Sequence, residues 1–258
     1  MKIAISGKGG VGKTTLAAIL SKVFSDKGYK VFAIDADPDS NLAITLGFSS
    51  SPTPLIEMQE LIEERTGAKV GERSPFFKLN PKVDDIPDRF FVYKGKIYLA
   101  VMGTVRGGGL GCACPENSFL KALLRHLVLE REDVVIMDME AGIEHLGRGT
   151  TQGIDILIIV VEPSLKSIET VHRISHLASQ IGIKRIKLVA NKLMDMKREK
   201  AFLRERLSGF DFIAFLPYNT SFYEADFSTS PVWEKVPQIL EEGKAITEKL
   251  IKEVKDER

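Results

Sequence analysis

A glycine-rich segment near the start of the chain has the residue types and spacing of a phosphate-binding loop. It reads Gly7-Lys8-Gly9-Gly10-Val11-Gly12-Lys13-Thr14 and fits the pattern G-x-x-x-x-G-K-[ST]. Glycines let backbone N–H groups turn towards phosphate oxygens, while the Lys13 amine neutralises the β and γ phosphates and the Thr14 hydroxyl ligates Mg²⁺. Lys13 is therefore also expected to act in catalysis. The nucleotide is expected to contact Gly9, Gly10, Val11, Gly12, Lys13, Thr14 and Thr15.

A second lysine lies near the start of this loop. Lys8 stands too close to Lys13 for both amines to bind one triphosphate from the same side. It is expected either to act in catalysis on a phosphate held by a facing subunit, or to be an exposed surface lysine.

Acidic residues end two of the predicted strands. Asp35, Asp37 and Asp39 follow the second apolar run, and Asp138 ends the run that starts at Val134. Carboxylates at the carboxyl ends of parallel strands stand where α/β sheets bind ligands. Asp37 is therefore predicted to orient or deprotonate an attacking water, and Asp138 to lie beside Mg²⁺. An Asp-Pro turn that caps the next element is the alternative for some of these acids.

Two strand ends further along the chain are candidates for a base-binding pocket. Asn191 closes the apolar run that ends at Ala190, and its amide can donate and accept together, which matches the edge of adenine. Pro217 lies at the end of the next predicted strand and is expected to line the same pocket. The alternative for Asn191 is a turn residue that closes the strand.

The two cysteines, Cys112 and Cys114, end a glycine-rich loop over residues 103–114. Pro115 is expected to open a helix, whose N-terminus favours the thiolate that binds metals. Two thiolates are half of a four-coordinate soft-metal site, and a two-fold dimer supplies the other half. Buried structural cysteines are the alternative.

His172 and His176 share one face of a predicted helix, a spacing that can bind metal. No third ligand is evident, so we expect both to be exposed helix residues.

Charge and hydropathy narrow the class of protein. Lys plus Arg number 36 and Asp plus Glu number 35, a net charge of +1 that excludes a histone-like or polybasic mechanism. The longest apolar run, Ile156 to Val161, has six residues, whereas a membrane helix needs about 20. The chain shows neither a signal peptide nor a disulfide framework. A soluble cytoplasmic protein is expected, with no nucleic-acid and no membrane partner.

The segments that must position these residues alternate between continuous apolar runs and helical periodicity. The runs are typical of strands covered on both faces, and they are Ile3–Ser6, Lys30–Ile34, Ile97–Met102, Val134–Asp138, Ile156–Val161, Ile186–Ala190 and Phe212–Leu216. Helices are predicted over Lys13–Lys27, Pro115–Glu130, Leu165–Ile181, Lys197–Leu207 and Val232–Lys255. This alternation indicates an α/β fold with a doubly wound, mostly parallel sheet flanked by helices, as in P-loop NTPases.

We predict a single P-loop ATPase domain over residues 1–258. An insert at 49–95, with a short helix (Leu55–Arg65) and a hairpin (Phe90–Leu99), interrupts the strand-helix rhythm. The cysteine loop at 103–114 is the second interruption.

The motifs together resemble one family. Segment 7–15 resembles the deviant Walker A loop of the nitrogenase iron protein, Min and Par superfamily of ATPases, and segments 35–38 and 138–142 match its two switch regions. Within this superfamily, the segment Cys-Ala-Cys-Pro-Glu-Asn at 112–117 is similar to the CooC-type ATPases that mature nickel-containing carbon monoxide dehydrogenase.

This resemblance implies an ATPase that hydrolyses ATP to ADP and phosphate and that closes into a homodimer with nucleotide. Lys8 would contact nucleotide across the dimer, Asp37 would position the water, and Thr14 with Asp138 nearby would bind Mg²⁺. Cys112 and Cys114 from two subunits would hold one Ni(II) or Zn(II) ion. The protein would then be a metallochaperone that assists nickel insertion into carbon monoxide dehydrogenase, its client.

Two other functions stay open. An iron–sulfur electron-transfer ATPase of the nitrogenase iron protein type also uses four thiolates across a dimer, but segment 138–142 contains no cysteine. A Min- or Par-type positioning ATPase would bind DNA or membrane. The last predicted helix has an apolar face without a basic face beside it, so packing against the sheet is expected instead. That face consists of Ile246, Leu250, Ile251 and Val254.

Overall fold

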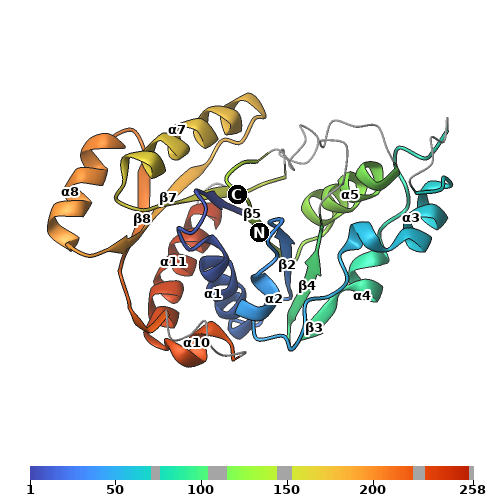
Figure 1. Cartoon of the computed structure of the whole chain (residues 1–258), viewed down its shortest axis with the longest axis horizontal. Coiled ribbons are helices and arrows are strands. Elements are labelled where there is room, and N and C mark those ends of the chain that lie inside the picture. Colours follow the sequence, from blue (N-terminus) through green and yellow to red (C-terminus); the bar gives the residue numbers. More distant parts are fainter. Residues whose placement is uncertain (71–75, 104–114, 144–152, 223–229, 256–258) are drawn as a thin grey trace.

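One eight-stranded sheet forms the middle layer of the computed structural model, which describes residues 1–70, 76–103, 115–143, 153–222 and 230–255. Its strands run in the order β3-β4-β2-β5-β1-β6-β7-β8 (Figure 1). Their bounds are β1 Lys2–Gly7, β2 Val31–Ala36, β3 Val92–Lys94, β4 Ile97–Val101, β5 Val134–Met139, β6 Ile156–Val161, β7 Ile186–Leu193 and β8 Asp211–Pro217. Strand β3 pairs with β4 in the antiparallel sense, and the other pairs are parallel.

The seven apolar runs are all strands, as predicted, and the hairpin expected over Phe90–Leu99 is β3–β4. Every residue of β1, β2, β5 and β6 is buried. Because both faces of these central strands are covered, an apolar side chain is stabilised at every position, which explains runs without alternation. The predicted doubly wound, mostly parallel sheet is confirmed.

Helices cover both faces of the sheet (Figure 1). One face packs against α1 Lys13–Asp26, α2 Leu42–Thr45, α10 Val232–Lys235 and α11 Gln238–Lys255. The other packs against α3 Gln59–Thr66, α4 Ile86–Phe90, α5 Pro115–Arg125, α7 Leu165–Gln180 and α8 Met196–Arg206, with a 3₁₀ turn η1 at Leu55–Glu57 and a π-helical turn η2 at His126–Glu130. Successive residues of one strand serve opposite faces, so Ile3 packs under α1 while Ala4 packs on the other side.

Three predicted helices differ from the structure in their detail. The span 232–255 is two helices, because Pro237 offers no N–H and Val236 before it leaves the helical region at φ −129°. The span 55–65 is the turn η1 followed by α3, and the last turn of 115–130 widens into η2. In α11, the predicted apolar face packs against the core cluster shared with α1: Ile246, Leu250 and Val254 are buried, and Ile251 is partly buried.

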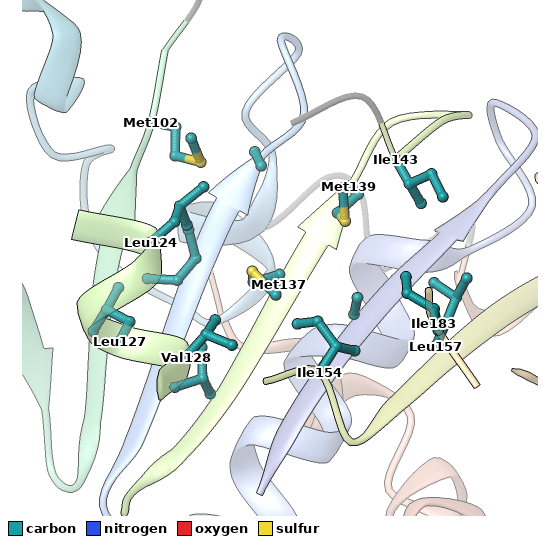
Figure 2. Packing of buried hydrophobic residues seen from close by; sticks show 14 of the residues in the cluster. Met102, Leu124, Leu127, Val128, Met137, Met139, Ile143, Ile154, Leu157 and Ile183 are labelled. Carbon is teal, nitrogen blue, oxygen red and sulfur yellow. The ribbon is translucent and has the colours of Figure 1, made fainter. Parts of the chain in front are cut away.

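The core beneath α5 fixes the helix that follows the cysteine loop. Figure 2 shows Leu124, Leu127 and Val128 packed over the same side of the sheet as Met137 and Met139 of β5. Each of these side chains is buried. Because α5 begins at Pro115, this packing anchors the chain directly after Cys114. In the part of the chain that the structure describes, no helix is long and apolar enough to cross a membrane.

Candidate nucleotide-binding site

The phosphate loop connects the end of β1 to the start of α1, as the sequence predicts. Gly10 and Gly12 have φ angles of 78° and 100°, the left-handed region in which only glycine is unstrained. Gly12 is the residue before the first turn of α1, and its carbonyl accepts the N–H of Leu16 at 3.1 Å. The N-terminus of a 14-residue helix therefore faces the loop, and its positive end favours an anion there.

Lys13 and Asp37 lie together at this loop. The Lys13 side chain is only 6% exposed, and its Nζ is 3.6 Å from Oδ2 of Asp37. Asp37 is fixed in turn, because its Oδ1 accepts the N–H of Asp39 at 3.1 Å and its carbonyl accepts the Ser40 hydroxyl at 3.1 Å. The structure thus places a fixed carboxylate beside the loop lysine, directly after β2.

Asp35 shapes this turn rather than facing solvent. Its side chain is buried, and its two oxygens accept the N–H of Asp37 at 3.2 Å and that of Leu42 at 3.0 Å. Burial raises the pKa of Asp35 to about 6, although the two N–H groups act in the opposite direction. The capping alternative that the sequence allows for some of these acids is therefore correct for Asp35.

Asp138 is a buried acid whose carboxylate lies beside the Thr14 hydroxyl. It stands opposite Asp35 in the register of β5 and β2, and neither of its carboxylate oxygens accepts a hydrogen bond of normal geometry. Burial raises its pKa to about 7, and the negative charge of Asp35 adds to this. The Thr14 hydroxyl and the Lys13 amine are close enough to lower that pKa. Unpaired oxygens beside the Thr14 hydroxyl are the hard ligands that Mg²⁺ takes, so these residues fit the ion.

Lys8 forms an ion pair within its own chain that the sequence analysis did not foresee. Its Nζ is 2.9 Å from Oε1 of Glu162, the residue that follows β6, and the Ser164 hydroxyl donates to the same oxygen at 3.2 Å. Burial acts to raise the pKa of Glu162, but the hydrogen bond and charge of Lys8, together with the Ser164 hydroxyl and the charge of Lys192, hold that pKa below its usual value. The pairing joins residues 154 positions apart, a relation that no local pattern reveals.

Hydrogen bonds that the sequence did not indicate hold the segment after Asp138. The buried Ser6 hydroxyl, one residue before the phosphate loop, lies 2.7 Å from the carbonyl of Glu140 and 3.1 Å from that of Gly142. Arg173 of α7 donates to the carbonyl of Ala141 at 3.2 Å. The segment that leads away from Asp138 is thus tied both to β1 and to α7.

A pocket of about 420 Å³ adjoins the loop where a nucleoside is expected. The residues predicted for base binding, Asn191 and Pro217, line this pocket, and so does Tyr218 beside Pro217. Sequence reasoning missed three further lining residues, Lys192, Phe222 and Glu242. The Asn191 amide is already engaged, because its Nδ2 donates to the Val11 carbonyl at 2.8 Å and its Oδ1 accepts the N–H of Lys192 at 2.9 Å. One N–H and one lone pair stay available for a base.

The cysteine site lies outside the described residues. Cys112 and Cys114 belong to segment 104–114, and only the start of α5 at Pro115, as predicted, belongs to the described structure. His172 and His176 are exposed on α7, as expected. Within the described ranges no group of three or more His, Cys, Asp and Glu side chains could hold a metal ion.

Comparisons with known proteins agree with this geometry. Residues 2–232 match the family model of the CobQ/CobB/MinD/ParA nucleotide binding domain, CbiA. The chain is 45% identical over 234 residues to an uncharacterized ATP-binding protein of Methanocaldococcus jannaschii, across 90% of this chain and 91% of that protein. It is 42% identical over 258 residues to the carbon monoxide dehydrogenase accessory protein CooC of Rhodospirillum rubrum, across 98% and 97% of the two chains. The structure of a ParA family ATPase from Chlorobium tepidum matches with a TM-score of 0.70 at 19% identity, across 97% of each chain, which is a likeness of fold.

Proposed function

The chain belongs to the CobQ/CobB/MinD/ParA family of nucleotide-binding domains and is an ATPase, and from this premise we propose that it is a nickel metallochaperone driven by ATP. In this proposal ATP closes a homodimer, and the dimer assists nickel insertion into a carbon monoxide dehydrogenase in the cytoplasm. The observation that carries it is the arrangement of Lys13, Asp37 and Asp138 around the phosphate loop, in a chain similar along its length to CooC.

The loop binds the phosphates of ATP, and Asn191 and Pro217 hold the nucleoside. Thr14 and Asp138 would hold the magnesium ion, which neutralises charge on the β and γ phosphate oxygens when bound. In hydrolysis a water oxygen bonds to the γ phosphorus while that phosphorus separates from the oxygen bridging to the β phosphate. Asp37 accepts the proton that the water loses. Lys13 and the loop N–H groups stabilise the charge that develops on ADP.

Dimer closure moves Lys8 from its own chain to the partner's nucleotide. In the structure the Lys8 amine is bound to Glu162, and both groups are at least partly exposed, so the pair contributes at most about 1 kcal/mol. A phosphate of the facing subunit carries more negative charge than one carboxylate, and it therefore competes well for the amine. Lys8 then couples the presence of a triphosphate to closure.

Closure also assembles the metal site. The Cys112 and Cys114 thiolates of each chain supply half of a four-coordinate site, and the helix that begins at Pro115 favours the ionised thiol. Ni(II), or Zn(II) in its place, is thus the cargo, shared between two chains. The near-neutral net charge of +1 gives no support to nucleic acid or membrane as a partner.

Hydrolysis at the phosphate loop is tested with Lys13→Ala. We expect loss of ATP turnover by two orders of magnitude or more, because the charge on the phosphates is left uncompensated. Lys22→Ala is the matched control, since Lys22 lies on the same helix and pairs with Asp26 at the surface, away from the phosphate loop. Turnover retained in the Lys13 variant would refute the assignment of the site.

Metal binding is tested by equilibrium dialysis with nickel. Cys112→Ala and Cys114→Ala should each abolish uptake and leave ADP affinity unchanged, because the thiolates do not touch the nucleotide in this proposal. His172→Ala with His176→Ala is the control, since these exposed side chains are the other soft donors close together in the sequence. Undiminished uptake by the cysteine variants would remove them from the mechanism. Anaerobic absorption spectra with iron–sulfur bands would favour the electron-transfer alternative.

A further inference from the structure

The end of β7 holds the outer side of the phosphate loop through two consecutive residues. The Lys192 ammonium donates to the Gly10 carbonyl at 2.6 Å, and the Asn191 amide donates to the Val11 carbonyl at 2.8 Å. The two residues are tied to one another, because the Lys192 N–H donates to the Asn191 side chain at 2.9 Å. Successive carbonyls of the loop therefore each have a donor from one strand end, 180 residues or more away in sequence.

These bonds matter because of how a phosphate loop works. Its N–H groups must point inward at the anion, which turns its carbonyls outward, where each needs a donor or water. A loop with three glycines in residues 9–12 loses much backbone entropy when it adopts one shape. Donors that form hydrogen bonds with the outward-facing carbonyls stabilise this loop conformation before the nucleotide binds.

The backbone of Lys192 supports a specific role. Its φ angle is 62°, in the left-handed region that lysine rarely adopts and that costs of order 1 kcal/mol or more. Strain of this kind persists only where the surroundings fix it. Here the strained residue is held by the Asn191 side chain on one side and by the phosphate loop on the other.

We propose that Lys192 is a positioning residue that preorganises the phosphate loop for nucleotide, acting with Asn191 from the end of β7. It acts through the Gly10 carbonyl rather than on the reacting atoms. We call the hydrogen bonds from Lys192 and Asn191 to the loop carbonyls the clamp. Because both residues also line the base pocket, the clamp connects that pocket to the phosphate loop. The inference rests on the proposed function for its ligand, but the shape of the empty loop does not depend on it.

Hydrogen exchange of the nucleotide-free protein tests the clamp directly. Lys192→Met should accelerate exchange in the peptide that covers residues 7–14 about tenfold, because one charge-assisted bond to the loop is lost. Lys192→Arg should restore slow exchange, since it keeps a charged donor. Lys197→Met is the matched control on the neighbouring helix, where the side chain is exposed. Equal protection of the loop in Lys192→Met and in the unmodified protein would overturn the proposal.

Ligand affinities separate loop positioning from contact with the base. Lys192→Met should weaken the binding of ADP and of pyrophosphate by a similar factor of about ten, with AMP affected less, since AMP uses less of the loop. Weakened ADP with unchanged pyrophosphate would mean that Lys192 acts on the nucleoside, and would overturn the proposal. The Lys13→Ala protein shows whether the phosphate-loop assignment, rather than the role of Lys192, is at fault. If Lys13→Ala also leaves pyrophosphate affinity unchanged, the phosphate-loop assignment itself is wrong.

Discussion

Replacement of Asp138 by Asn probes the electrostatics of the nucleotide site in the absence of nucleotide. The carboxyl is fully buried, neither of its oxygens has a hydrogen bond of normal geometry from the described residues, and burial raises its pKa from 3.8 to about 7. The folded protein therefore binds this proton more tightly than the unfolded chain does. The carboxyl contributes its full stabilisation below pH 3.8, and that contribution is lost as the pH rises towards about 7.

The size of the loss follows from these two pKa values. Between pH 5 and pH 8 the carboxyl of the unfolded chain is already ionised, whereas that of the folded protein has still to ionise. The free energy of unfolding should fall over this interval by up to about 3 kcal/mol through this one group, at about 1.4 kcal/mol per pH unit. The Asn side chain does not titrate, and the cost of its own unpaired amide is the same at both pH values.

Urea unfolding at 25 °C, with EDTA and without nucleotide, measures this difference. The stability of D138N relative to the unmodified protein should increase by about 2–3 kcal/mol between pH 5 and pH 8. Asp26→Asn serves as the control, because this acid is half exposed and lies in a surface ion pair with Lys22. A relative stability of D138N that is the same at both pH values would refute the account of Asp138 as a buried, unpaired acid. Saturating Mg²⁺ and ADP should remove the effect in the unmodified protein, because the ion satisfies the carboxylate.

The remaining predictions concern three glycines and the exposed Asp26. Gly12→Ala should weaken ADP binding at least tenfold in a fluorescence titration, because Gly12 has φ 100° and a Cβ there would meet the Asn191 amide. Gly243→Ala should lower the free energy of unfolding by about 1–3 kcal/mol, since a Cβ would press on Ile19 where α11 crosses α1; Gly209→Ala, with open space around it, should change it by less than about 0.5 kcal/mol. Asp26→Asn should cost less than about 0.5 kcal/mol at pH 7, as exposed i,i+4 pairs do, and a larger loss would contradict the surface description.

The fold followed from the sequence because its central strands are buried on both faces. A continuous apolar run such as Ile156–Val161 is typical of a strand that is covered on both faces, and all six of its residues are buried. Helix interruptions were harder to predict. Pro237 lies between two apolar helical patterns of matching phase, and the pattern alone does not reveal that the chain stops and restarts there. The π-helical turn at His126–Glu130 has no sequence signature at all.

The site was predictable where one local motif dictates the chemistry. The spacing of glycines, lysine and threonine identifies the phosphate loop, and the ends of two predicted strands identify Asp37 and Asp138. The structure places these residues close together. Glu162 and Lys192 were missed, because each acts through a side chain bond to a residue more than 150 positions away. The only local signal for Lys192 is its position after Asn191 at a strand end, where a left-handed residue turns its amine back towards the loop.

Nickel content measured together with mass in solution tests the central claim most directly. Sedimentation equilibrium and metal analysis on the same samples, with ATP, with ADP and without nucleotide, give the number of ions per chain in each oligomeric state. The account predicts one ion for every two chains, in a dimer that requires nucleotide and that Lys8→Ala fails to form. A monomer that holds its ion equally tightly with and without nucleotide would contradict it.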